Sequence, residues 1–265
     1  MAKKNKKNQK KLPVPDEKDL ISMSLGDHLE ELRYRLVMAF MGIFLGMVIC
    51  LFMGKFLLDV IAEPFRIAMQ QVGMEPELQI LEPAEKFLIY LKTSLIFGII
   101  LSSPWAIYHV WRFVSAGLYR HERKYVYYVT PISAFLFITG CFFFLLVIGP
   151  ISLKFFLGFD TGIEFVKVGV TLTSYINFIL RLTLIFGIAF QLPIAIVFAE
   201  KMGLVDVEML TSIRKFVLIG LLIVSAMATP PDVVSQIALA TPLYILYEGS
   251  IIACRLSRRR KNKEL

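Results

Sequence analysis

Residues 126–148 read VYYVTPISAFLFITGCFFFLLVI, a run without a single Asp, Glu, Lys or Arg. A helix needs about 20 apolar residues to cross the roughly 30 Å of hydrocarbon in a bilayer, and this run supplies them. Of the 265 residues, 57% are hydrophobic and 19% are charged, and the mean hydropathy is +0.67. Because one soluble core cannot hide so much apolar surface, the sequence predicts a membrane protein.

Six apolar runs follow one another along the chain, so we predict an all-α membrane protein with six transmembrane helices. They cover roughly residues 36–53, 87–110, 126–148, 176–199, 216–228 and 233–253. The fifth run is too short to cross a normal bilayer upright, which indicates a locally thin membrane or a hairpin tip buried against the loops.

The stretch Thr229-Pro230-Pro231-Asp232 separates the last two runs. Because a Pro-Pro step cannot continue a helix, we expect a tight turn here and a hairpin of the fifth and sixth spans. Asp232 is expected to cap the last helix at its amino end, and Gln236 lies one turn further on.

Lysine and arginine alternate in density between the loops. Along the chain, segments with nine, four, three and six lysines and arginines alternate with segments that have three, two and none. By the positive-inside rule both termini are cytoplasmic. We therefore expect a basic, disordered cytoplasmic tail over residues 1–23, a membrane domain over 24–255 and a second basic cytoplasmic tail over 256–265. Lys92 and Arg181 lie near the external ends of their spans, where they can anchor the helix at the interface.

The two longer external loops should form a cap. Residues 54–86 are acidic, and Pro64, Pro76 and Pro83 are expected to break them into short helices. Residues 149–175 mix apolar and polar side chains, so we expect this loop to pack on that cap.

Two cytoplasmic segments hold candidate binding residues. Ser24 and Asp27 start a helix in which Glu31 and Arg35 can pair at i, i+4, and composition alone favours a plain interfacial helix. Glu122 lies among basic neighbours in residues 118–124, where a solvated charge cluster is the simple interpretation. Alternatively Glu31 and Glu122 converge on a cationic partner, because paired carboxylates suit guanidinium groups; sequence spacing leaves both possibilities open.

Thr183, Gly187 and Gln191 lie on one face of the fourth span, and Pro193 should kink it. Small and polar residues favour packing between membrane helices. The stripe therefore serves either packing within the chain or docking of another membrane helix.

Catalytic and metal sites find no support in the sequence. The three cysteines lie far apart in or beside apolar runs, and no H-E-x-x-H, G-x-S-x-G or phosphate-binding glycine loop is present. The formal net charge of +8 sits at the chain ends and between apolar runs, which indicates membrane topology and not nucleic acid. We expect no enzyme, metal or cofactor. A small-molecule or ion transporter is the alternative, although we find no internal repeat or midplane acid.

Three stretches resemble signature segments of the TatC family, the receptor subunits of the twin-arginine protein-export system. They are residues 28–36 (HLEELRYRL), 118–123 (LYRHER) and 229–236 (TPPDVVSQ), and residues 63–65 (EPF) and 186–193 (FGIAFQLP) add to them in the same order. The resemblance implies a glove-shaped fold with short fifth and sixth helices in a bacterial inner membrane. It also implies functional turns at Pro64 and at Pro230, Pro231, Asp232 and Gln236.

The resemblance also implies binding roles. Twin-arginine signal peptides of folded substrates would bind Glu31 and Glu122, with Arg33, Arg35, Phe113 and Arg120 as neighbours. The single-span partners TatA and TatB would bind near Gln191, Thr183 and Met227, in a receptor complex that is itself a homo-oligomer and is driven by proton-motive force. Many members have Glu where this chain has Gln191, which can form hydrogen bonds but cannot carry charge.

Overall fold

A computed structural model describes residues 25–118, 123–158, 169–228 and 233–261. These residues are almost entirely helical. The helices are α1 (Leu25–Phe52), α2 (Gly54–Val72), α3 (Glu85–Ala116), α4 (Arg123–Phe143), the π-helical η2 (Phe144–Ile148), α5 (Gly149–Gly158), α6 (Leu172–Ala189), α7 (Leu192–Lys201), α8 (Val207–Ser212), α9 (Arg214–Ala228) and α10 (Val233–Lys261).

Five helical segments of the described chain are long and apolar enough to cross a membrane, which confirms the predicted all-α class. They are Leu29–Phe52, Glu85–Ala116, Arg123–Gly158, Leu172–Lys201 and Gln236–Arg258. The predicted fifth span, α9, is not among them: it has 15 residues, about 22 Å at 1.5 Å per residue and short of the ~30 Å of hydrocarbon. The sixth span is not short, since α10 has 29 residues and continues beyond its apolar run into the basic segment 255–261.

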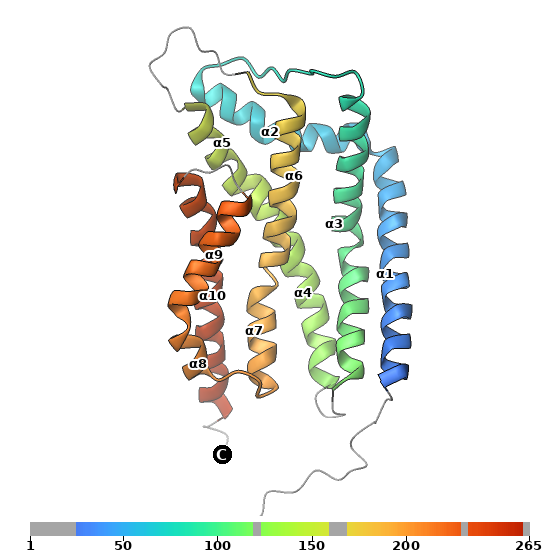
Figure 1. Cartoon of the computed structure of the whole chain (residues 1–265), viewed down its shortest axis with the longest axis vertical. Coiled ribbons are helices and arrows are strands. Elements are labelled where there is room, and N and C mark those ends of the chain that lie inside the picture. The colour runs from blue at the N-terminus through green and yellow to red at the C-terminus, as the bar shows by residue number, and fades with distance from the viewer. Residues whose placement is uncertain (1–24, 119–122, 159–168, 229–232, 262–265) are drawn as a thin grey trace, which may run out of the picture.

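The long helices run side by side along the long axis (Figure 1). We call "lower end" the end where α1 begins, α3 ends and α10 ends, and "upper end" the opposite end, crossed by α2. The main buried cluster lies where α2 and α5 meet α6 and η2, with Ile61, Phe65, Phe144 and Phe186 each at most 1% exposed. The lower half of the bundle is therefore held by fewer buried side chains than the upper half.

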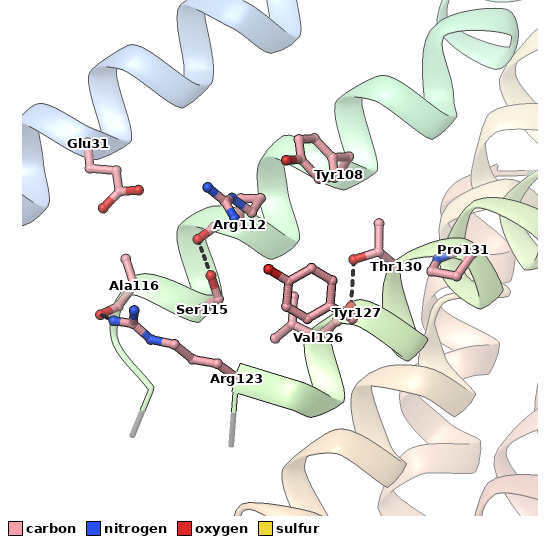
Figure 2. Close-up of a pocket in the computed structure, with 10 residues that line it drawn as sticks. All are labelled: Glu31, Tyr108, Arg112, Ser115, Ala116, Arg123, Val126, Tyr127, Thr130 and Pro131. Atoms are coloured by element: carbon pink, nitrogen blue, oxygen red, sulfur yellow. Dashed lines mark hydrogen bonds between the residues drawn. The ribbon is translucent and has the colours of Figure 1, made fainter. Parts of the chain in front are cut away.

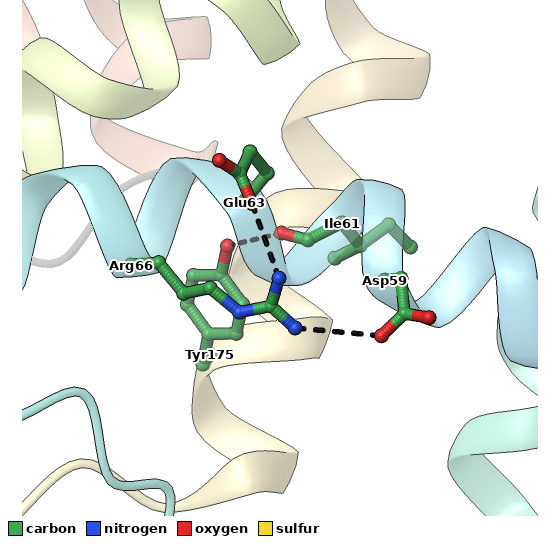
Figure 3. Close-up of polar contacts among 5 residues, drawn as sticks. All are labelled: Asp59, Ile61, Glu63, Arg66 and Tyr175. Atoms are coloured by element: carbon green, nitrogen blue, oxygen red, sulfur yellow. Dashed lines mark hydrogen bonds and ion pairs between the residues drawn. The ribbon is translucent and has the colours of Figure 1, made fainter.

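One continuous helix, α2, covers the upper end, which corrects the prediction that Pro64 would break this loop. Pro64 lies inside α2 and is buried. Figure 3 shows contacts that span its turn: Arg66 reaches Asp59 (3.4 Å) and Glu63 (3.2 Å), and the Tyr175 hydroxyl of α6 donates to the Ile61 carbonyl at 2.5 Å. Packing on α6 thus stabilises a helix that the proline alone would disfavour.

The second external loop packs on this cap, as predicted. Helix α5 packs on α2, and a short parallel bridge joins Gln79 to Thr171. The predicted kink in the fourth span is also present, because α6 ends at Ala189 and α7 starts at Leu192, with Pro193 in its first turn.

Helices α9 and α10 pack on each other, as expected for a hairpin. The residues of the predicted turn, 229–232, lie outside the described residues, as do the tail over residues 1–23 and the end of the chain from residue 262.

Candidate binding site at the lower end

A pocket of about 350 Å³ lies at the lower end, where α1, α3 and α4 meet. Figure 2 shows the side chains around it. It is lined by Glu31 of α1, by Tyr108, Arg112, Ser115 and Ala116 of α3, and by Arg123, Val126, Tyr127, Thr130 and Pro131 of α4. Three segments that are distant in the sequence therefore contribute to one site.

Glu31 is the acidic member of this lining. Its Oε1 accepts a hydrogen bond from Nη2 of Arg35 at 3.1 Å, and the two side chains are 20% and 17% exposed. The predicted i, i+4 pair is therefore confirmed. Between described residues, Oε2 of Glu31 accepts no hydrogen bond, and Nε of Arg35 is buried without a partner. The carboxylate points from α1 towards the end of α3 (Figure 2).

Two arginines, Arg112 and Arg123, line the same pocket as Glu31. Arg123 donates to the carbonyls of Ala116 (3.5 Å) and Leu118 (3.4 Å), so it stabilises the last carbonyls of α3, where a cation is favoured by the helix dipole. The Arg112 guanidinium lies 5.9 Å from the centre of the Tyr108 ring, a cation–π contact. Both residues are held in position by α3 itself.

The described part of the site holds an excess of positive charge. One carboxylate, Glu31, faces the guanidinium groups of Arg35, Arg112 and Arg123. A cationic ligand fits here only if Glu31 exchanges partners or if another carboxylate joins it. Glu122 directly precedes Arg123 in the sequence, but it and Arg120 lie outside the described residues.

The other predicted neighbours are close in the chain without lining the pocket. Arg33 is exposed on α1, and Phe113 is half-buried on α3 beside Arg112. The structure therefore places Glu31 in the lining of the pocket with Arg35 paired to it, and Arg33 and Phe113 lie outside the lining.

Sequence reasoning missed the contribution of α3. Tyr108, Arg112 and Ser115 are spaced at i, i+4 and i+7 and all line the pocket. This helical spacing was visible in the sequence.

Gln191, the polar residue of the fourth span, forms hydrogen bonds with another helix of the same chain. Gln191 Nε2 donates to the Ser133 carbonyl at 2.9 Å, and the Ser133 hydroxyl donates to Gln191 Oε1. Trp111 Nε1 donates to the same hydroxyl at 3.1 Å. Thr183 is 1% exposed and donates to the carbonyl of Ile179. Both residues of the stripe thus face neighbouring helices of this chain.

The residues predicted around the fifth span have different surroundings. Met227 of α9 is 78% exposed. Gln236 of α10 donates through Nε2 to the Leu222 carbonyl of α9 at 2.8 Å, which links the two helices of the hairpin. Pro230, Pro231 and Asp232 lie outside the described residues.

Metal ligands do not gather anywhere in the described part of the chain. No group of three or more His, Cys, Asp or Glu side chains there is placed to hold an ion. The pocket can bind charged and aromatic groups through its arginines, tyrosines and Glu31, and nothing in its lining supplies a nucleophile beside a base.

Comparison with known proteins assigns a family. Residues 27–242 match the model described as Sec-independent protein translocase protein (TatC). The protein of that name from Desulforapulum autotrophicum is 38% identical over 90% of this chain and 86% of its own length, and the one from Aquifex aeolicus is 34% identical over 91% and 98%. A crystal structure titled twin arginine translocase receptor TatC superimposes with a TM-score of 0.77 at 34% identity, over 87% of this chain and 99% of that one.

Proposed function

Because this chain belongs to the TatC family of Sec-independent protein translocase proteins, we propose that it is the receptor and core subunit of a twin-arginine translocase, in which the lower-end pocket binds the signal peptide. The family makes the chain a multi-pass membrane component of that translocase with a transport role, not an enzymatic one. The arginine pair of a signal peptide would bind Glu31 and Glu122.

The observation that carries this proposal is the position of Glu31. Its carboxylate faces a cavity of about 350 Å³ and, among the described residues, forms an ion pair only with Arg35 of its own helix. A substrate guanidinium offers the same planar fork of donors, so it can replace Arg35 without a new type of contact. Glu122 would add the second carboxylate and offset the positive charge of Arg112 and Arg123.

The lower end would then face the cytoplasm of a bacterial cell, with both termini there. This orientation follows from the distribution of lysine and arginine, which is dense in the loops of the lower end and sparse in α2 and the segment after it. Substrates synthesised in the cytoplasm would reach the pocket directly.

Partner helices of TatA and TatB would bind the outer face of α9 and the region of Gln191, in a homo-oligomeric receptor complex driven by proton-motive force. The exposed Met227 supports a contact through α9. Gln191 would have to exchange its hydrogen bonds with Ser133 for bonds to a partner, whereas the buried Thr183 would act by positioning α6. Pro64 and the turn at Pro230, Pro231, Asp232 and Gln236 would maintain the two ends of the scaffold.

The test is equilibrium binding of a twin-arginine signal peptide to the full chain in nanodiscs. Glu31→Gln should lower the affinity at least tenfold, because a hydrogen bond to a charged group contributes about 1.5–3 kcal/mol. Glu30→Gln is the matched control, since Glu30 is the exposed neighbour on the same helix and does not line the pocket. A twin-lysine peptide should bind weakly to all three proteins. Equal losses in both variants would disprove a specific role for Glu31.

A further inference from the structure

A second cavity, separate from the lower-end pocket, lies between α4 and α7. It has a volume of about 660 Å³ and opens on the outer surface of the bundle. It is lined by Lys124, Tyr125, Tyr128, Val129, Ile132 and Leu136 of α4 and by Pro193, Ile194, Val197, Phe198 and Lys201 of α7. We call this cavity the α4–α7 groove; it shares no lining residue with the lower-end pocket.

The charges of the groove are confined to one end. Lys124 lies at the start of α4 and Lys201 at the end of α7, both at the lower end of the bundle (Figure 1). Lys201 Nζ lies 4.9 Å from the centre of the Tyr125 ring. No carboxylate of the described chain forms an ion pair with either lysine. The groove thus presents two ammonium groups and, with Tyr128, two tyrosine rings at its mouth.

The rest of the groove is apolar and has the depth of one lipid leaflet. From Lys124 to Leu136 the helix rises about 18 Å at 1.5 Å per residue, while half of the hydrocarbon core is about 15 Å. When Ile132, Leu136 and Val197 lie among the acyl chains, the lysines and tyrosines therefore lie at the level of the headgroups. Tyrosine is enriched at that level, and basic pockets between helices on the cytoplasmic side bind anionic headgroups.

We propose that the α4–α7 groove binds one anionic phospholipid, with its phosphate between Lys124 and Lys201 and its acyl chains along Ile132, Leu136 and Val197. The charge pattern favours a lipid over a partner helix. An apolar transmembrane helix in this groove would cover the apolar part and give neither ammonium group a counter-charge, which the described residues do not supply either, whereas a phosphate satisfies both of them.

The first experiment measures lipid retention by native mass spectrometry of the purified full chain, titrated with phosphatidylglycerol or phosphatidylcholine. The double variant Lys124→Gln/Lys201→Gln should lower the affinity for phosphatidylglycerol about thirtyfold, equivalent to about 2 kcal/mol, on the scale of two lysines near an anionic surface. Phosphatidylcholine should bind weakly and equally to both proteins.

The matched control is Lys215→Gln. Lys215 is also an exposed lysine near the lower end, on α9, and it also contacts an aromatic ring, that of Phe216 at 5.2 Å. Retention of phosphatidylglycerol should not change in this variant. An equal loss in the control would show an unspecific charge effect and overturn the proposal.

The second experiment locates the lipid. The Trp111 ring packs on Phe198, a wall of the groove, with 4.9 Å between ring centres, and the only other tryptophan of the chain is Trp105. In a Trp105→Phe background, phosphatidylglycerol with brominated acyl chains should quench Trp111 more strongly than brominated phosphatidylcholine, and the double lysine variant should remove that difference. Equal quenching by both lipids, or displacement of phosphatidylglycerol by a single-span partner peptide regardless of the lysines, would reject the lipid as the occupant.

Discussion

At the residue scale, the ion pair of Glu31 and Arg35 contributes little to stability. Ion pairs at i, i+4 on a helix contribute about 0.3–0.5 kcal/mol. Both side chains here are mostly shielded, at 20% and 17% exposure, but replacing Arg35 by a ligand guanidinium leaves the Glu31 carboxylate paired. A pair that costs so little to break can be exchanged for an equivalent pair with a ligand. This low cost suits Glu31 to reversible binding.

Glu122 provides the sharpest test of the second carboxylate. Glu122→Ala and Glu122→Gln should both reduce crosslinking of a twin-arginine peptide to residues 118–124, with the alanine variant worse, and Glu122→Asp should keep part of it. Each lost contact should cost ~1 to 3 kcal/mol, or roughly tenfold in affinity. Crosslinking yields are compared at matched expression level. Equal yields in all three variants would mean that Glu122 serves topology alone.

Gln191 connects α4 to the break between α6 and α7, so it can be tested for both of its possible roles. Gln191→Leu should destabilise the chain by about 1 kcal/mol, the size of an interhelical hydrogen bond in lipid, measured by unfolding in mixed micelles. It should also weaken crosslinking to TatA or TatB by a similar amount.

A double-mutant cycle with Ser133→Ala separates these effects. The double variant should lose less stability than the sum of the two single losses, because both variants remove the bond from the Ser133 hydroxyl to Gln191 Oε1. Only Gln191→Leu also removes the bond to the Ser133 carbonyl. Unchanged crosslinking to both partners would leave Gln191 with a packing role only.

At the element scale, α1 depends on a close approach to α3. A Cβ added at Gly98 would lie 2.5 Å from the Met47 backbone nitrogen, and one at Gly46 would lie 2.6 Å from the Gly98 carbonyl. Of all its neighbours in the described chain, α1 packs mainly on α3. The position of Glu31 relative to Arg112 is therefore set by these two glycines.

Gly98→Ala should push the two helices apart and cost about 1–3 kcal/mol, the usual penalty of overpacking. Because α1 carries Glu31, the same variant should weaken binding of a twin-arginine peptide. Unfolding in mixed micelles measures the first effect, and peptide binding in nanodiscs measures the second.

Gly220→Ala on α9 is the control for this change, because nothing lies within 4 Å of its added Cβ. It should be neutral or slightly stabilising, since alanine favours helix more than glycine does. If Gly98→Ala proved equally harmless, α1 would not depend on the glycine contact.

The cap offers a second test of packing between elements. Tyr175→Phe removes the hydroxyl that donates to the Ile61 carbonyl and leaves the ring in place. The free energy of unfolding should therefore fall by about 1 kcal/mol. Tyr128→Phe is the control, because the Tyr128 side chain is 74% exposed. A loss no larger than that of the control would show that α2 is held by apolar packing alone.

At the scale of the whole molecule, the orientation of the bundle in the membrane is testable by labelling. Single cysteines at Glu75 and Gly162 should react with an impermeant reagent added from outside, whereas cysteines at Glu122, Asp206 and Lys263 should react only after the membrane is opened. The expectation follows from the alternation of basic loops. External labelling at Glu122 would invert the proposed orientation.

The sequence by itself determined the class, the order of the spans and the break at Pro193. The length of an apolar run and the effect of proline on a helix can both be read from a short stretch of sequence. Residues 126–148 therefore predict a span, and Gln191-Leu192-Pro193 predict a break, whatever the rest of the chain does. The candidate residue Glu31 and its pairing with Arg35 were also predictable, because both lie on one helical turn.

Only the tertiary structure decided which surfaces meet. Pro64 remains inside α2 because Tyr175, more than a hundred residues away, bonds to Ile61. Arg112 joins the pocket because Gly46 and Gly98 bring α1 against α3. The α4–α7 groove exists because two helices leave space between them. Such contacts depend on the relative position of helices, and no local spacing in the sequence encodes that position.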